Sequence, residues 1–306
     1  MRHEDLLSRV VCTTPPSGIR RFFDLANEMK ESVISLSIGE PDFVTPWQVV
    51  DAGIRSLKNG ETHYSSNQGL MALRESICRY SLRKYGLEYD PRTETVVTVG
   101  GSEAIDAAVR ALVNPGDEVI VPQPCFVSYE ACVRLSGGVP VTIACRREDD
   151  FKLRVEQLEA AVTPRTKMVI LGYPNNPTGA VMSREDLEPL VRFFERRDIA
   201  VVSDELYAEL TYAPASHCSI ASFPSMRDRT IVIGGFSKAF AMTGWRIGYA
   251  VGPSPWMMAM NKIHQYAIMC APTTAQHAAI EALESCDDPV RMMTEEYDRR
   301  RRVVLD

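Results

Sequence analysis

The chain has 306 residues, of which 45% are hydrophobic and 24% charged, and its formal net charge is −6. This length and apolar content suit one large α/β domain plus a smaller piece, and the scattered basic residues argue against a nucleic-acid groove. No apolar run approaches the roughly 20 residues that a membrane-spanning helix needs, so we expect neither nucleic acid nor membrane as a partner.

Cysteine usage and the N-terminus indicate the compartment. The eight cysteines are spread out without a Cys-x-x-Cys pair, which is typical of reduced thiols in a cytoplasm. The N-terminal Met-Arg-His-Glu-Asp lacks the apolar core of a signal peptide. The five histidines form no metal-binding spacing. We therefore expect a cytoplasmic protein without a metal.

The first third of the chain is predicted to be mainly helical. Residues 1–32 are expected to form an arm and one helix that begins near Ser17, and residues 33–38 a short strand that ends at Gly39-Glu-Pro-Asp-Phe43. Helices are predicted over residues 46–59 and 70–85. The polar segment Tyr64-Ser-Ser-Asn-Gln-Gly69 lies between them.

From Thr95 onward strands and helices alternate, which is typical of a parallel sheet built from βαβ units. The helices are predicted over 104–112, 153–161, 187–196 and 295–304, with another that ends at 135. The strands are predicted over 94–99, 118–122, 139–144, 167–171, 199–203 and 247–251, and one more runs from Ile231 to the glycines at 234 and 235.

Lys238 follows one of these strands at the place where open α/β sheets bind ligands. Desolvation there would lower the pKa of the amine from about 10.4 and free it for Schiff-base chemistry. The alternative is a surface lysine whose stem lies along the fold. Arg246 follows across a turn and could clamp a phosphate with its planar fork.

Two more strand ends carry candidate polar sites. Gly100-Gly-Ser102 opens a helix, and the unpaired N–H groups of a helix N-terminus bind anions; a plain tight turn is the alternative. Neither a Walker loop nor a Gly-x-Gly-x-x-Gly motif is present. Asp204 ends a buried strand, where a carboxylate is costly unless it is paired; a helix N-cap is the alternative.

The spacing Ser-Lys-x7-Arg-x-Gly-Tyr around Lys238, together with Asn176-Pro-Thr-Gly179, resembles the class I and II aminotransferases, which are pyridoxal-phosphate enzymes of fold type I. The resemblance covers essentially the whole chain. It implies a mostly parallel central sheet with helices on both faces, plus a small domain. The subgroup it resembles most closely holds aromatic and N-acetyl-diaminopimelate aminotransferases; the strings that point to it are Ser17-Gly-Ile-Arg20, Gly39-Glu-Pro-Asp42, Met242-Thr-Gly-Trp-Arg246 and His264-Gln-Tyr266.

The resemblance implies a role for residues at the cofactor ring. Lys238 would hold pyridoxal phosphate as a Schiff base, and its freed amine would move the proton between the substrate α-carbon and the cofactor. Asp204 would keep the pyridine nitrogen protonated. Asn176 and Tyr207 would bond the phenolic oxygen. Phe126 would stack on the ring, although a plain core position is the usual fate of a phenylalanine.

The same resemblance implies roles for residues further from the ring. Gly101, Ser102 and Arg246 would bind the cofactor phosphate. Tyr64 would reach the phosphate of a neighbouring subunit, which predicts a homodimer. The backbone of Gly39, together with Asn176, would bind the substrate. The structural alternative for Gly39 and for Asn176 is a turn without a binding role. For Tyr64 it is a surface anchor.

The sequence departs from the family pattern in two places. The family often has a phosphate-binding serine three residues before the lysine, where this chain has Gly235; Ser237 is the candidate replacement. The chain also stops at Asp306, before the family's C-terminal small domain and its carboxylate-binding arginine. We assign residues 1–44 to an N-terminal arm and part of the small domain, 45–285 to the large cofactor-binding domain, and 286–306 to the start of a linking helix.

The predicted function is transfer of an amino group from an L-amino acid to a 2-oxo acid. Residues 263–290 contain no arginine or lysine and carry Tyr266, Met269 and Pro272, so a large or aromatic donor is favoured over aspartate. The alternatives are an aspartate-type aminotransferase, a C–S β-lyase of the same fold, and a catalytically silent protein. Without the family's arginine, we expect the 306-residue form to bind the cofactor but to transaminate poorly.

Overall fold

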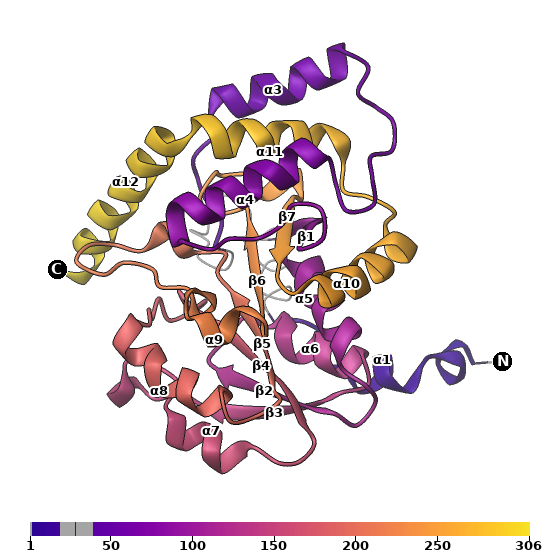
Figure 1. The fold of residues 1–306 in the computed structure, drawn as a ribbon, viewed down its shortest axis with the longest axis vertical. Coiled ribbons are helices and arrows are strands. Elements are labelled where there is room, and N and C mark those ends of the chain that lie inside the picture. Colours follow the sequence, from indigo (N-terminus) through magenta and orange to yellow (C-terminus); the bar gives the residue numbers. More distant parts are fainter. Residues whose placement is uncertain (1, 19–27, 29–38) are drawn as a thin grey trace.

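The structure is a computed structural model, and it describes residues 2–18, 28 and 39–306 of the chain. The strand predicted over 33–38 and Arg20 lie outside the described residues, as does most of the helix predicted to begin near Ser17. Seven strands of the described residues form one sheet in the order β1-β7-β6-β5-β4-β2-β3 (Figure 1). Their bounds are β1 Thr95–Thr98, β2 Glu118–Gln123, β3 Val139–Ala144, β4 Thr166–Gly172, β5 Ala200–Asp204, β6 Thr230–Gly235 and β7 Gly248–Val251.

The sheet is mostly parallel, as predicted. The central strands β4, β5 and β6 pair in parallel, and so do β2 and β3. Only β7, among the described strands, runs against its neighbours, β1 and β6. Parallel strands present their carboxyl ends at one edge of a sheet, so the segments that follow β2, β4, β5 and β6 meet there.

Helices cover both faces of the sheet, which confirms the predicted architecture (Figure 1). On one face, α5 (Gly100–Leu112), α6 (Ser128–Leu135) and α10 (Ser254–Ala267) pack on apolar side chains such as Val202 and Ile233. The other face carries α4 (Met71–Tyr85) and α11 (Thr273–Ser285) beside β6 and β7, and α7 (Val155–Ala161), α8 (Arg184–Phe194) and α9 (Pro224–Arg227) beside β2, β4 and β5. Because successive side chains of a strand point to opposite faces, each strand contributes apolar side chains to the core on either face of the sheet.

The remaining helices lie outside these two layers. In Figure 1, α3 (Trp47–Lys58) lies along α11, and α12 (Asp287–Leu305) extends from the end of α11. Near the N-terminus are α1 (Arg9–Thr13) and the 3₁₀ turn η1 (His3–Leu6); further 3₁₀ turns are η3 (Arg147–Asp149), η4 (Ala208–Leu210), η5 (Ile220–Ser222) and η6 (Thr243–Trp245). In the described parts of the chain, no helix has the length and apolar content to cross a membrane.

Candidate functional site

Four of the predicted site residues line one open cavity of about 800 Å³ at the carboxyl edge of the sheet: Gly39, Asn176, Tyr207 and Lys238. They come from the segments before α3 and after β4, β5 and β6. Each strand delivers its segment to the same edge because the strands are parallel. The α12 side chains Tyr297 and Arg301 form part of the wall. The sheet therefore brings together residues that lie up to 199 positions apart.

The Lys238 side chain is half-buried three residues after the end of β6. Its Nζ donates a hydrogen bond to the carbonyl oxygen of Gly39 at 2.6 Å and lies 5.8 Å from the ring centroid of Tyr207. Burial lowers the pKa of this amine, and the Arg246 charge lowers it further, while Glu40 opposes both effects. The surface-lysine alternative does not describe this environment.

Asp204 is the last residue of β5, and its carboxylate lies on the α6 face of the sheet. Tyr129 Oη donates to Oδ2 at 2.7 Å, and the backbone N–H of Leu206 donates to Oδ1 at 3.2 Å. Burial raises the pKa of the carboxyl, while the two hydrogen bonds lower it. The nearest helical turn, η4, has Tyr207 as its N-cap. The N-cap alternative for Asp204 is therefore wrong.

Tyr207 lies beside Asp204 and faces the cavity. Burial raises the pKa of its hydroxyl to about 12, and the Asp204 carboxylate contributes to the rise. The Tyr207 hydroxyl is therefore protonated at neutral pH and can donate a hydrogen bond to an oxyanion. Asn176, which follows β4 within the same cavity wall, supplies an amide that can donate as well.

Tyr129 is a residue that the sequence prediction missed. It lies in the first turn of α6, and Phe126 lies just before that helix. The two rings meet edge to face with centroids 5.8 Å apart. Gly172 leaves room for the hydroxyl, because a Cβ there would lie 2.6 Å from Tyr129 Oη. Tyr129 follows the end of β2, as Phe126 does, and this position after a strand end is the signal that could have identified Tyr129.

Gly100 begins α5 and has φ +77°, so the tight-turn alternative gives way to a helix start. Gly101 is buried behind it, and Ser102 is exposed in the first helical turn. A Cβ on Gly100 would lie 2.7 Å from Nη2 of Arg246. The guanidinium is held there by a 2.9 Å bond from Nη1 to the carbonyl of Thr243. Cation, hydroxyl and free helix N–H groups thus form a cradle suited to a phosphate.

The structure gives a physical reason for one departure from the family pattern. A Cβ on Gly235 would lie 2.6 Å from Cδ1 of Leu206, so a serine at this position would require Leu206 to move. Leu206 also lies 3.4 Å from the position of a Cβ on Gly101. Ser237, the candidate replacement, is buried.

Tyr64 does not line the cavity. It lies on the loop between α3 and α4 with 81% of its surface exposed. The loop is held to the α10–α11 connection, because Nδ2 of Asn67 donates to the carbonyl of Met269 at 2.7 Å and Gln276 bonds both Ser65 and Leu70. The structure therefore does not place Tyr64 in the wall of the cavity that contains Lys238.

Known proteins that resemble this chain identify its family. Residues 31–306 match the family model described as aminotransferase class I and II. A Bacillus subtilis (strain 168) protein named as an aminotransferase, YugH, is 52% identical over 300 residues, which are 98% of this chain and 77% of that protein.

Two solved structures share the fold. The Thermus thermophilus aspartate aminotransferase with maleate gives a TM-score of 0.94 at 40% identity, over 100% of this chain and 80% of that one. The Pyrococcus horikoshii OT3 aromatic aminotransferase gives 0.87 at 43%, over 92% and 76%.

Proposed function

Because the chain belongs to the class I and II aminotransferases, we propose that the cavity beside Lys238 is its active site. Enzymes of this family depend on pyridoxal phosphate and transfer an amino group between an amino acid and a 2-oxo acid, and this chain is one of them. The observation that carries the placement is the half-buried Lys238 amine, with its lowered pKa, in one cavity with Asn176 and Tyr207.

The residues present fit the cofactor. Space beside Gly100, where a Cβ would meet the Arg246 guanidinium, suits a phosphate, and the Asp204 carboxylate can hold a proton on a pyridine nitrogen. When bound, the cofactor supplies an aldehyde carbon for Schiff-base formation and a ring that accepts electrons. Phe126 stacks on that ring in this proposal, and Ser102 and the Gly101 N–H bind the phosphate.

In this proposal, the polar residues of the cavity have distinct roles toward the cofactor and the substrate. The Nζ atom of Lys238 would hold the cofactor, and the same amine would take the proton from the α-carbon of the donor amino acid. Its lowered pKa increases the fraction of unprotonated amine that can do this at neutral pH. Tyr207 and Asn176 donate to the phenolic oxygen, and the Gly39 segment orients the substrate.

Addition of amino donors to the cofactor-loaded protein tests this assignment. A wild-type sample should convert bound cofactor to its amine form with a donor and recover with a 2-oxo acid. Lys238→Ala should lose this exchange by several orders of magnitude, while Lys262→Ala, which changes an exposed residue of α10, should keep it. Equal exchange by Lys238→Ala and wild type would refute the placement.

A large or aromatic donor is the preferred substrate in this proposal. The cavity wall carries three tyrosines, Tyr207, Tyr212 and Tyr297. Its cation Arg301 is already bonded to Asp298 at 2.6 Å, which reduces its pull on a second carboxylate. Tyr266 and Met269, on which the sequence prediction relied, are exposed and do not line this cavity. A higher kcat/KM for aspartate than for phenylalanine and tyrosine would contradict the preference.

The active form is a homodimer in this proposal, with each site built from two subunits. Tyr64 and Tyr266 are 81% and 83% exposed, and Ile268 and Met269, which follow Tyr266 in the chain, are 48% and 44% exposed. Such a group of apolar side chains is typical of an interface. Mixed Tyr64→Phe and Lys238→Ala subunits should regain activity at up to about a quarter of the sites, because only hybrid dimers contain one intact site. A fully active monomer would contradict the dimer.

The cytoplasm is the proposed location, on the basis of the dispersed cysteines of the sequence. Fractionation of the source cells should find the protein with cytoplasmic markers, and recovery in a secreted or membrane fraction would contradict it.

A further inference from the structure

Glu205, directly after Asp204, is a buried carboxylate with a complete set of hydrogen-bond donors. Its side chain is 3% exposed. The hydroxyls of Ser203 and Ser219 donate to Oε1 at 2.8 and 2.6 Å, and Nε2 of His217 contacts Oε2 at 2.8 Å. A carboxylate only accepts, so His217 donates through Nε2. These donors come from β5 and from the segment that leads into η5.

Asp204 and Glu205 point to opposite faces of the sheet, because successive side chains alternate along a strand. Asp204 faces Tyr129 on α6, whereas Glu205 is buried on the other face beside His217. The Glu205 N–H extends the sheet ladder by donating to the carbonyl of Ile233 at 2.9 Å. Glu205 is the first residue beyond β5, and its hydrogen bonds connect it to β6 and to the segment that contains His217 and Ser219.

The turn that begins at Glu205 carries the residues of the proposed active site. The carbonyl of Glu205 accepts from the N–H of Ala208 at 2.9 Å, which closes the turn around Leu206 and Tyr207. Leu206 lies against Gly101 at the start of α5, and Tyr207 lines the cavity. A shift of Glu205 would move Asp204, Leu206 and Tyr207 together.

We propose that Glu205, clamped by Ser203, Ser219 and His217, is a positioning residue that sets the orientation of Asp204 and Tyr207 toward the cofactor. The inference rests on the proposed roles of those two residues. Removing one partner from a buried charged cluster leaves a polar group unsatisfied, so the turn must rearrange to satisfy it. The rearrangement reaches the cofactor side because the Asp204–Glu205 backbone is shared by both faces.

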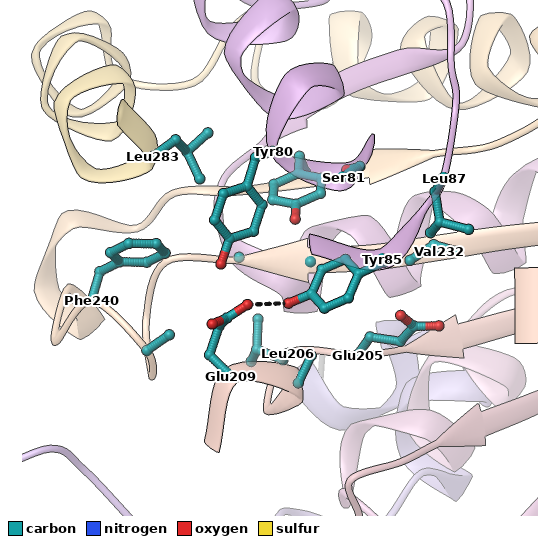
Figure 2. Close-up of a pocket in the computed structure, with 15 residues that line it drawn as sticks. Tyr80, Ser81, Tyr85, Leu87, Glu205, Leu206, Glu209, Val232, Phe240 and Leu283 are labelled. Carbon is teal, nitrogen blue, oxygen red and sulfur yellow. Dashed lines mark hydrogen bonds between the residues drawn. The ribbon is translucent and has the colours of Figure 1, made fainter. Parts of the chain in front are cut away.

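Figure 2 shows a matched control close by. Glu205 and Glu209 both line a small cavity of about 20 Å³, and Tyr80 and Tyr85 of α4 line the same cavity. Glu209 lies on η4 and accepts from Tyr85 Oη and Lys84 Nζ. It is thus a half-buried carboxylate of the same face, but its bonds lead to α4 and not into the turn that carries Asp204 and Tyr207.

The groups that face Glu205 are few. Asp204 precedes it, His217 contacts its carboxylate, and the ring of Tyr85 packs on that of His217. Tyr89, Tyr249 and the Cys218 thiol lie within range of its charge. The tyrosine pKa values are all raised by burial, so these hydroxyls stay neutral near pH 7. Loss of the Glu205 charge therefore removes an anion that these tyrosines do not replace.

The test compares Glu205→Gln with Glu209→Gln in the same 306-residue chain. We would measure the Kd for pyridoxal phosphate, the pH midpoint of the absorption change of the loaded protein, the melting temperature, and the apo crystal structures. Glu205→Gln should raise the Kd about tenfold, a change of about 1.4 kcal/mol. It should move the midpoint to lower pH by about 0.5 unit or more, since loss of an anion disfavours a nearby cation. Its apo structure should show a displaced Asp204–Tyr207 turn.

Glu209→Gln should lower only the melting temperature. A Glu205→Gln protein that also changes only its melting temperature would overturn the inference. If Glu205→Gln does not fold, Ser219→Ala and Ser219→Thr replace it, because threonine keeps the hydroxyl and should restore the wild-type midpoint while alanine does not. Equal midpoints in Ser219→Ala and wild type would again overturn it.

Asp204→Asn and Tyr207→Phe separate this inference from the proposed site. If both leave the Kd and the pH midpoint unchanged, the proposed roles of Asp204 and Tyr207 are wrong. If both change these quantities while Glu205→Gln does not, the site stands and only the positioning role of Glu205 is wrong.

Discussion

Replacement of Tyr129 by phenylalanine removes the hydrogen bond at 2.7 Å to Oδ2 of Asp204 and leaves the ring in place. A bond to a charged group contributes about 1.5–3 kcal/mol. Its loss should raise the pKa of the Asp204 carboxyl further, because the Tyr129 bond favours the charged form of the carboxyl. Burial already raises that pKa above its usual value, and the Tyr129 bond partly offsets the rise.

The sign of the pH effect follows from linkage. The folded-state pKa of Asp204 lies above the unfolded value, so between the two pKa values the folded state keeps the proton and the unfolded state has lost it. The free energy of unfolding therefore falls as pH rises through that window. Tyr129→Phe raises the upper limit of this pH window. The variant should therefore lose more stability relative to wild type at neutral pH than at low pH.

Urea unfolding of the apoprotein at pH 7.5 and near pH 4 measures this difference. Tyr129→Phe should be destabilised by about 1.5–3 kcal/mol at pH 7.5 and by about 0.5–1.5 kcal/mol near pH 4, where only a neutral hydrogen bond is lost. Tyr173→Phe is the matched control: Tyr173 is also buried, but its hydroxyl bonds the backbone of Phe151 and Leu153 and lies beside the Cys145 thiol, where Tyr129 bonds a carboxylate. The control should lose equal stability at both pH values, and the same behaviour in Tyr129→Phe would refute the reasoning.

Three further changes test the site. Gly172→Ala should mimic Tyr129→Phe in the pH dependence of unfolding, because its Cβ would lie 2.6 Å from the tyrosine hydroxyl; a pH-independent loss would contradict this. Gly100→Ala should weaken pyridoxal phosphate binding at least tenfold, since its Cβ would displace the Arg246 guanidinium. Gly116→Ala is the control, because Gly116 has φ +90° and open space around it, and it should cost only about 1 kcal/mol of stability. Equal affinities of the two variants for pyridoxal phosphate would contradict this. Acetylation of Lys238 in the apoprotein, followed by peptide mass spectrometry, should rise with a pH midpoint below 10.5, and a midpoint at or above that value would contradict the desolvated amine.

Much of the fold could be predicted because hydrophobic patterning decides it. The central residues of β4 and β5, 168–171 and 200–202, are apolar and buried, as expected for strands covered on both faces, and the predicted bounds of both strands agree with the structure within one residue. The helix α5 begins at Gly100 and not at Ala104, because a glycine with positive φ starts it and helix propensity alone does not indicate that position. The long α12 begins at Asp287, eight residues before the predicted start, since its first half packs on α11.

The candidate site could be predicted in outline but not in its contacts. A polar residue at the end of a buried strand is visible in the sequence, and this identified Asp204 and Lys238. The bond from Tyr129 depends on the register that places Gly172 beside Asp204, and the sequence does not state that register. The clamp on Glu205 likewise joins residues from separate segments, and only the folded chain brings His217 and Ser219 to it.

The central claim is that Lys238 is the residue that binds the cofactor covalently. Borohydride reduction of the loaded protein, followed by peptide mass spectrometry, tests it most directly, because reduction fixes the Schiff base to the lysine that formed it. The account predicts pyridoxyl mass on the peptide that contains Lys238 and none after Lys238→Ala. Pyridoxyl mass on another lysine in the wild-type protein, with Lys238 unmodified, would contradict it.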